Sequence, residues 1–173
     1  MKNINSFLSW SESQLNQAGV LSPRLDSEIL LAHTLKLSRE QLLIHSKRIL
    51  NEAEKKCAEI NLKRRRKREP VSLITGCQEF WSLDFLVDEN VLTPRPETEL
   101  LIETALSCIS PSSKNILDLG TGSGVLALVM AKEVLDSKVT ALENDLKALN
   151  IAKKNATNHG MRDRIKFLCK DLR

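Results

Sequence analysis

The sequence predicts an α/β protein in three parts: a small helical bundle over residues 1–68, a β-hairpin linker over 69–92 and the first half of a parallel-sheet domain over 93–173. Three observations support this prediction. Apolar residues first recur at helical spacing, then alternate with polar ones, and finally follow the order strand, glycine loop, helix, strand, acid. A length of 173 residues suits one ordinary domain, or a small domain with part of a larger one.

The helical part begins with apolar residues spaced three and four positions apart from Ile4 to Ala18, and Gly19 ends that segment. Four or five short amphipathic helices are expected, without a strand. Their starts are predicted from N-cap patterns: Ser22 before Pro23, Ser38 with Gln41, and Asn51 with Glu54.

The linker is predicted from a change to a period of two. Apolar residues alternate with polar ones over 71–73 and again over 83–87, and Gly76 interrupts the run. We expect one β-hairpin here. Its aromatic residues, Phe80 and Trp81, are expected to pack the hairpin against a neighbouring element.

The third part alternates helices with short apolar strands. We expect a helix over 98–109, a strand over 115–119, a helix over 125–135, a strand over 138–142, a helix over 146–157 and a strand over 165–169. Glu143 follows the second strand and Asp171 the third. This order is typical of the start of a nucleotide-binding α/β domain.

A glycine-rich loop carries the chemistry of this part. In Asp118-Leu119-Gly120-Thr121-Gly122-Ser123-Gly124, the glycines let the backbone turn tightly and approach a ligand. The following helix offers free N–H groups and the positive end of its dipole to an anion. The Glu143 carboxylate can accept two hydrogen bonds from a ribose diol. Together these features predict a ligand that carries adenosine.

The glycine spacing narrows the choice of ligand. A dinucleotide fingerprint requires a third glycine at position 125, which is Val125 here. Glycines at 120, 122 and 124 resemble the loop of S-adenosylmethionine-dependent methyltransferases. Two alternatives remain: an NAD(P)-dependent dehydrogenase and a glycine turn without a ligand.

A narrower resemblance rests on several segments in order. The chain resembles the peptide chain release factor glutamine N5-methyltransferases over essentially all of its length. Sister enzymes that methylate a ribosomal protein rank second, because they typically carry a different pattern after Pro-Arg. The segments are Ser22-Pro23-Arg24-Leu25-Asp26-Ser27-Glu28-Ile29-Leu30-Leu31, Arg64-Arg65-Arg66 before Glu69-Pro70, Glu79-Phe80-Trp81-Ser82, and Thr93-Pro94-Arg95-Pro96-Glu97-Thr98-Glu99 before the glycine loop.

This resemblance implies the N-terminal half of a Rossmann-like class I methyltransferase domain, with S-adenosyl-L-methionine as cofactor and no metal. Glu143 would bind the ribose, where relatives often have Asp. Phe80 and Arg95 would lie near the mouth of the site on the substrate side, where a packing role is equally expected. The remaining residues implied to contact the cofactor are Gly120, Thr121, Gly122, Ser123, Gly124, Asp171 and Leu172.

The implied reaction transfers a methyl group to the side-chain amide of a glutamine in the GGQ motif of class I peptide chain release factors. The helical domain would help to hold the release factor. In the family an Asn-Pro-Pro-Tyr motif orients the glutamine amide, but this sequence has no tyrosine and no Asn-Pro pair. We therefore assign no catalytic residue, and we expect a truncated chain that binds S-adenosylmethionine weakly on its own. Two alternatives are a non-catalytic release-factor-binding module and the product of a disrupted gene.

Composition excludes several other classes. The longest apolar stretch, 125–131, is too short to span a bilayer, which takes about 20 residues.

Six positive charges lie in the run 63–68, and removing them from the net charge of +4 leaves −2. We expect that run to be a solvated helix end, with an acidic partner as the alternative and no direct contact with nucleic acid. The four cysteines are widely separated, so a cytoplasmic protein without disulfides or zinc is expected.

The strand at 115–119 carries one further expectation. In a complete domain of this kind it would lie inside the sheet, paired on both sides. Without later strands it is expected to form an exposed apolar edge that can pair with another chain.

Overall fold

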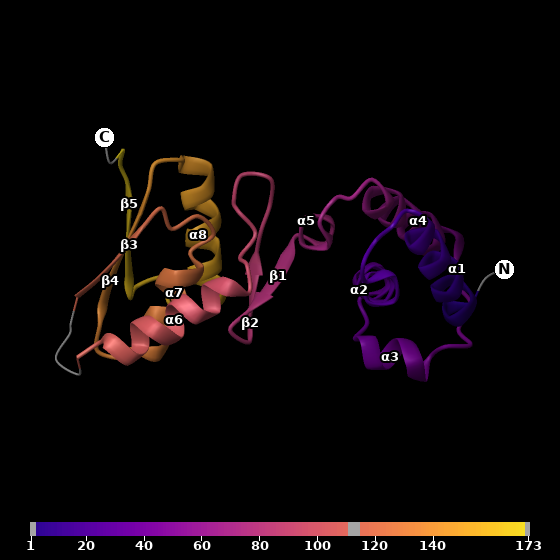
Figure 1. Ribbon diagram of the computed structural model, residues 1–173, viewed down its shortest axis with the longest axis horizontal. Coiled ribbons are helices and arrows are strands. Elements are labelled where there is room, and N and C mark those ends of the chain that lie inside the picture. The colour runs from indigo at the N-terminus through magenta and orange to yellow at the C-terminus, as the bar shows by residue number, and fades with distance from the viewer. Residues whose placement is uncertain (1–2, 111–114, 172–173) are drawn as a thin grey trace. The chain divides into compact units, whose positions relative to one another are not determined.

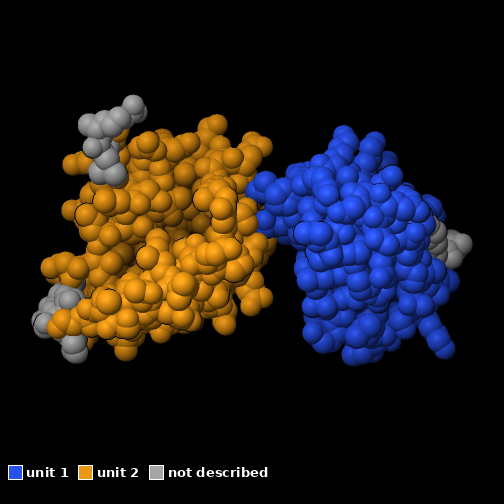
Figure 2. All heavy atoms as spheres, viewed as in Figure 1, with its two compact units in different colours: residues 1–75 blue, residues 76–173 orange. Residues whose placement is uncertain are grey.

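The structure, a computed structural model, describes residues 3–110 and 115–171. The chain forms two compact units, Met1–Thr75 and Gly76–Arg173, coloured blue and orange in Figure 2. This division groups the β-hairpin with the α/β part of the chain.

The first unit is helical. Both predicted capping boxes are present, at Ser38 and Asn51, so these two helix starts are confirmed. Ser22 also stands at the predicted N-cap position, but its hydroxyl donates to Asp26 Oδ1 over 2.9 Å instead of capping the backbone. The helices are α1 (Ile4–Gln17), α2 (Pro23–Leu35), α3 (Arg39–Ile44), α4 (Glu52–Arg66) and α5 (Val71–Thr75).

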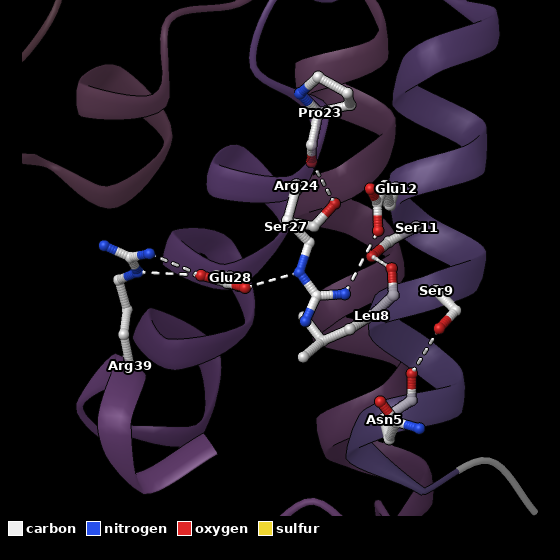
Figure 3. A network of polar contacts seen from close by, with 10 residues as sticks. All are labelled: Asn5, Leu8, Ser9, Ser11, Glu12, Pro23, Arg24, Ser27, Glu28 and Arg39. Atoms are coloured by element: carbon white, nitrogen blue, oxygen red, sulfur yellow. Dashed lines mark hydrogen bonds and ion pairs between the residues drawn. The ribbon is translucent and has the colours of Figure 1, made fainter. Parts of the chain in front are cut away.

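Polar side chains tie these helices together around an apolar core that includes Phe7, Leu31 and Leu42. Figure 3 shows Glu28 between two arginines, with Oε1 accepting from Arg24 Nε over 2.6 Å and Oε2 from Arg39 Nη2 over 2.7 Å. Burial acts to raise the pKa of the Glu28 carboxyl, but the hydrogen bonds from Arg39 and Arg24 outweigh it and lower that pKa.

The run of basic residues at the end of α4 divides into two kinds. Arg64 pairs with Glu69, and Arg65 pairs with the buried Asp26, with 2.7 Å between Arg65 Nε and Asp26 Oδ2. Lys63 and the residues at 66–68 are exposed. Part of the predicted solvated helix end is therefore internal structure.

The linker differs from its prediction at one point. Residues 71–73, expected to be extended, lie in α5, because the Pro70 carbonyl accepts from the N–H groups of Leu73 and Ile74, each over 3.1 Å. Three alternating residues are too few to distinguish a strand from one helical turn. The hairpin itself is shorter, with β1 (Cys77–Phe80) antiparallel to β2 (Leu83–Leu86).

Trp81 and Ser82 form the two-residue turn of this hairpin. Their φ angles are +53° and +55°, which is the left-handed region that the twist of a tight hairpin requires. Glu99 accepts from the Trp81 N–H over 3.1 Å, and Glu133 accepts from Trp81 Nε1 over 2.9 Å. These contacts hold a turn that is strained for residues other than glycine.

The α/β unit contains a parallel sheet in the order β3-β4-β5. The predicted bounds of β3 and β5 agree to the residue, and α7 ends two residues earlier than expected. Asp118 and Ala141 are register partners, as are Glu143 and Cys169. The elements are α6 (Glu97–Cys108), β3 (Asn115–Leu119), α7 (Val125–Glu133), β4 (Lys138–Glu143), α8 (Leu146–Asn158) and β5 (Ile165–Cys169).

The helices of this unit lie on one side of the sheet (Figure 1). Val139, Ala141 and Ile165 point to that side and are at most 3 % exposed. Leu117 and Leu119 are 59 % and 54 % exposed, and among the described strands β3 pairs with β4 alone. The expected apolar edge is therefore present. No described helix is both long enough and apolar enough to cross a membrane.

Candidate cofactor site

The glycine loop connects β3 to α7 and is fastened to the end of β4. The Leu142 carbonyl accepts from the N–H groups of Gly120 and Thr121, over 2.8 and 3.0 Å. Gly120, Gly122 and Gly124 all have positive φ angles, which glycine adopts with little strain. The loop thus has a defined shape at the carboxyl end of the sheet, where α/β folds place their ligands.

Asp118 anchors the loop from below. Asp118 is only 8 % exposed. Its Oδ2 accepts from Thr121 Oγ1 over 2.6 Å and from the Ala127 N–H over 3.2 Å. Burial raises the pKa of this carboxyl, helped by the nearby Glu143 charge and opposed by the two hydrogen bonds. One carboxylate therefore joins the loop to the first turn of α7.

Glu143 closes the loop from the neighbouring strand. Its Oε2 accepts from the Gly122 N–H over 2.9 Å, and its Oε1 accepts from the N–H groups of Asn144 and Asp145 over 2.9 and 3.3 Å. The structure thus places the acid expected to bind a ribose directly against the glycine loop.

Helix α8 supports the loop from behind. A Cβ atom at Gly124 would lie 2.9 Å from Leu128 Cδ1 and 3.0 Å from the Ala152 Cβ, so only glycine fits between the two helices. One turn further along α8, the fully buried Asn155 donates to the Ser123 carbonyl over 2.8 Å. Asn155 also donates to the Leu86 carbonyl and accepts from the Leu86 N–H, which attaches the hairpin to the same helix.

A cleft of about 350 Å³ opens in front of the loop. Residues 120–123 and the start of α7 line one part of it, and residues 92–95 with Thr98 line another. Arg95, predicted from sequence, is therefore beside the loop. The N-terminal end of α7 carries positive dipole charge here. Glu143 does not line the cleft itself, but its carboxylate accepts from the N–H of the lining residue Gly122. The surroundings of the loop therefore suit a ligand with both an anionic group and a donor-rich group.

The other predicted residues lie elsewhere. Phe80 is 3 % exposed and packs edge-on against Phe85, with ring centroids 6.3 Å apart, so it belongs to the core. Asp171 is exposed, two residues beyond β5, and Leu172 lies outside the described residues. Within residues 3–110 and 115–171, no three His, Cys, Asp or Glu side chains gather as a metal site would need.

Sequence reasoning named Asp118 only as the start of the glycine-rich segment, without a role, and missed Asn155. Each left a signal, because each is a polar residue in a position where the apolar pattern demands burial: Asp118 within a buried strand and Asn155 on the apolar face of α8. Buried polar groups require partners, and here the partner in each case is the glycine loop.

Known proteins are similar to this chain along most of its length. A sequence model described as the PrmC N-terminal domain matches residues 6–76, and one described as the methyltransferase small domain matches residues 96–173. A release factor glutamine methyltransferase from Rhodopirellula baltica is 39 % identical over 98 % of this chain and 59 % of its own length. One from Vibrio cholerae is 40 % identical over 89 % of this chain and 54 % of its own length.

The chain is a relative of the release factor glutamine methyltransferases. It spans somewhat more than half the length of these two relatives. Residues 96–173 correspond to the first half of a Rossmann-like methyltransferase domain. A solved S-adenosylmethionine-dependent methyltransferase from Geobacter sulfurreducens, in complex with S-adenosyl-L-homocysteine, is 28 % identical over 44 % of this chain and 30 % of its own, with a TM-score of 0.37.

Proposed function

We propose that this chain supplies the cofactor-binding part of a protein-glutamine methyltransferase. The reaction transfers a methyl group from S-adenosylmethionine to the side-chain amide of a glutamine in the GGQ motif of class I peptide chain release factors. The observation that carries the proposal is the Glu143 carboxylate held 2.9 Å from the N–H of Gly122, which lines a ligand-sized cleft, in a chain related to release factor glutamine methyltransferases.

The residues present fit this cofactor. A Cβ at Gly120 would meet no atom within 4 Å, and one at Gly122 would meet only the Gly120 carbonyl oxygen at 4.0 Å, so both glycines face open space. A volume of about 350 Å³ lies within the range of roughly 300–1,000 Å³ typical of small-molecule pockets. When bound, the cofactor supplies an electrophilic sulfonium methyl group.

Each part of the cleft has a proposed role. Residues 120–124 hold the methionine part through the loop backbone, and Glu143 accepts from the ribose hydroxyls. By the family resemblance, Asp171 and Leu172 are assigned to contact with the adenine ring. Arg95 contacts the substrate side, and Phe80 supports the hairpin from within the core. We assign no residue of this chain to the chemical step itself.

The release factor is proposed as the partner of the helical unit, and the cytoplasm as the location, given the four widely spaced cysteines. A second candidate function, release-factor binding without chemistry, is favoured by the separate apolar core of that unit. Capture of a purified class I release factor by the full chain tests both. Retained capture without binding of S-adenosylhomocysteine would select the second candidate.

Backbone amide NMR provides the test of the cofactor site, because it detects even millimolar binding. S-adenosylhomocysteine is expected to shift the amide signals of 120–124 and 143–145 in the labelled full chain. Glu143→Gln should weaken binding by about tenfold or more, since a hydrogen bond to a charged acceptor contributes roughly 1.5–3 kcal/mol. The exposed Glu103→Gln on α6 is the matched control. Shifts caused by NADH and not by S-adenosylhomocysteine would contradict the proposal.

A further inference from the structure

Asn155 on α8 is fully buried and uses its whole side-chain amide. Its Oδ1 accepts from the Leu86 N–H over 2.7 Å. Its Nδ2 donates to the Leu86 carbonyl over 3.0 Å and to the Ser123 carbonyl over 2.8 Å. An amide nitrogen carries two hydrogens, so each hydrogen of Nδ2 is committed to a different segment of the chain. One segment is the hairpin, and the other is the glycine loop.

The outer edge of β2 is matched to one face of α8. Alternate residues of an antiparallel strand direct their backbone groups away from the partner strand, and on β2 these residues are Asp84 and Leu86. The Asp84 carbonyl accepts from His159 Nε2 over 2.8 Å, and Leu86 is bound by Asn155. Four residues of a helix advance about 6 Å, and two residues of a strand advance about 6.6 Å. The helix therefore takes the place of a neighbouring strand along this edge.

Ser123 is the point at which Asn155 holds the glycine loop. Ser123 is 4 % exposed and belongs to the segment 120–123 that lines the cofactor cleft. A movement of the loop that turned the Ser123 carbonyl would leave a buried hydrogen of Asn155 without an acceptor, and so would a movement of the hairpin at Leu86. A buried donor without a partner is unfavourable. The loop and the hairpin therefore keep each other in place through one side chain.

We infer that Asn155 is a positioning residue that couples the hairpin to the cofactor loop. A ligand that fixes the loop also fixes the Ser123 carbonyl, and Asn155 then holds Leu86 more firmly. By linkage, a change that releases Leu86 weakens the binding of that ligand by the same factor. The coupling rests on the proposed function for the identity of the ligand, which is S-adenosylmethionine or the product S-adenosylhomocysteine.

Hydrogen exchange in the labelled full chain tests the coupling from the loop to the hairpin. Saturating S-adenosylhomocysteine is expected to slow exchange of the Leu86 N–H by about fivefold more than that of the Ser137 N–H, which is the lower end of typical couplings. Ser137 donates to the Val134 carbonyl over 3.1 Å in the turn before β4, at the opposite end of that strand from the loop. Its exchange reports the stabilisation that any bound ligand gives to the whole unit.

A matched pair of variants tests the coupling from the hairpin to the loop without a ligand. Leu86→Pro removes the N–H that donates to Asn155, and proline is tolerated on an edge strand where the N–H points away from the partner strand. Leu86→Ala keeps both backbone groups and shortens a side chain that is 37 % exposed. We expect Leu86→Pro to shift the amide signals of 122–124 and Leu86→Ala to leave them in place. Leu86→Pro should also bind S-adenosylhomocysteine about fivefold more weakly than Leu86→Ala.

Each outcome decides one question. If S-adenosylhomocysteine protects Leu86 no more than Ser137, or if Leu86→Pro leaves the loop signals in place, Asn155 is a structural residue only and the coupling is overturned. If Leu86→Pro does not fold, the exchange measurement on the parent chain decides. If S-adenosylhomocysteine does not bind the parent chain, the proposed function fails, and the ligand-free comparison of the two variants decides the coupling by itself.

Discussion

Two buried aspartates, one in each unit, are stabilised in different ways. Asp26 on α2 is 5 % exposed and pairs with Arg65 on α4, with 2.7 Å between Asp26 Oδ2 and Arg65 Nε. Asp118 on β3 is 8 % exposed and accepts hydrogen bonds from a hydroxyl and a backbone N–H. Within the described residues, no lysine or arginine lies within ion-pair distance of Asp118.

The difference separates a charge that is neutralised within its own unit from one that holds the loop of the candidate cofactor site. Asp26 joins two helices, and its charge is neutralised by a neighbour in the same unit. Asp118 lies beneath the glycine loop, with no cation at ion-pair distance among the described residues, and burial raises the pKa of its carboxyl. Charges that are left uncompensated in this way are concentrated at functional sites, because a ligand can supply the missing partner.

Breaking the ion pair should have the largest effect. Arg65→Met removes the cation and leaves the Asp26 carboxylate buried, so we expect the free energy of unfolding of the helical unit to fall by about 3 kcal/mol. Arg66→Met, at the exposed neighbouring position, should change it by less than about 0.5 kcal/mol. Amide hydrogen exchange measures each unit separately. Equal losses in the two variants would contradict a structural role for the pair.

A methyl group at the glycine loop should have the next largest effect. Gly124→Ala combines a φ of +86° with contacts of 2.9 and 3.0 Å to Leu128 and Ala152, so a loss of about 2–3 kcal/mol is expected in the α/β unit. Gly19→Ala in the helical unit has a similar φ of +69°, but its nearest neighbour is Arg68 Nη2 at 3.5 Å, an ordinary contact. Its expected loss is about 1 kcal/mol. Urea unfolding of each unit, followed by hydrogen exchange, compares the two.

Neutralising Asp118 should have the smallest effect, and comparison with the same change at Asp26 makes it diagnostic. Asp118→Asn keeps an oxygen that accepts from Thr121 and removes a desolvated charge, so stability at pH 7 should change by no more than about 0.5 kcal/mol. Asp26→Asn should cost about 1.5–3 kcal/mol, because Arg65 loses its charged partner. A larger loss for Asp118→Asn than for Asp26→Asn would reverse the comparison.

The pH profile sharpens this last test. Since the pKa of Asp118 is raised in the folded state, the folded protein binds this proton more tightly than the unfolded chain does. The contribution of Asp118 to stability should therefore fall as the pH rises from the ordinary aspartate value through the raised pKa, and stay constant above it. Asp118→Asn should remove this slope. An unchanged slope would show that another group is responsible.

The sequence-based predictions were accurate where the pattern depends on residues that are close together in the chain. Capping boxes at Ser38 and Asn51 were predicted correctly because their partners lie three residues away. The strands at 115–119 and 165–169 were predicted to the residue because apolar runs bounded by polar residues leave little choice. The short alternation at 71–73 failed because a carbonyl at Pro70, which no apolar pattern reveals, starts a helical turn.

The sequence by itself determined the order of the elements, the glycine loop and Glu143 as its acidic neighbour, because these depend on local spacing. Only the tertiary structure decided that Asp118 and Asn155 hold the loop, that Arg95 shares its cleft while Phe80 is buried in the core, and that one face of the sheet is open. These features join residues that are far apart in the chain. Their hydrogen bonds and burial depend on how helices and strands pack, which neither composition nor periodicity specifies.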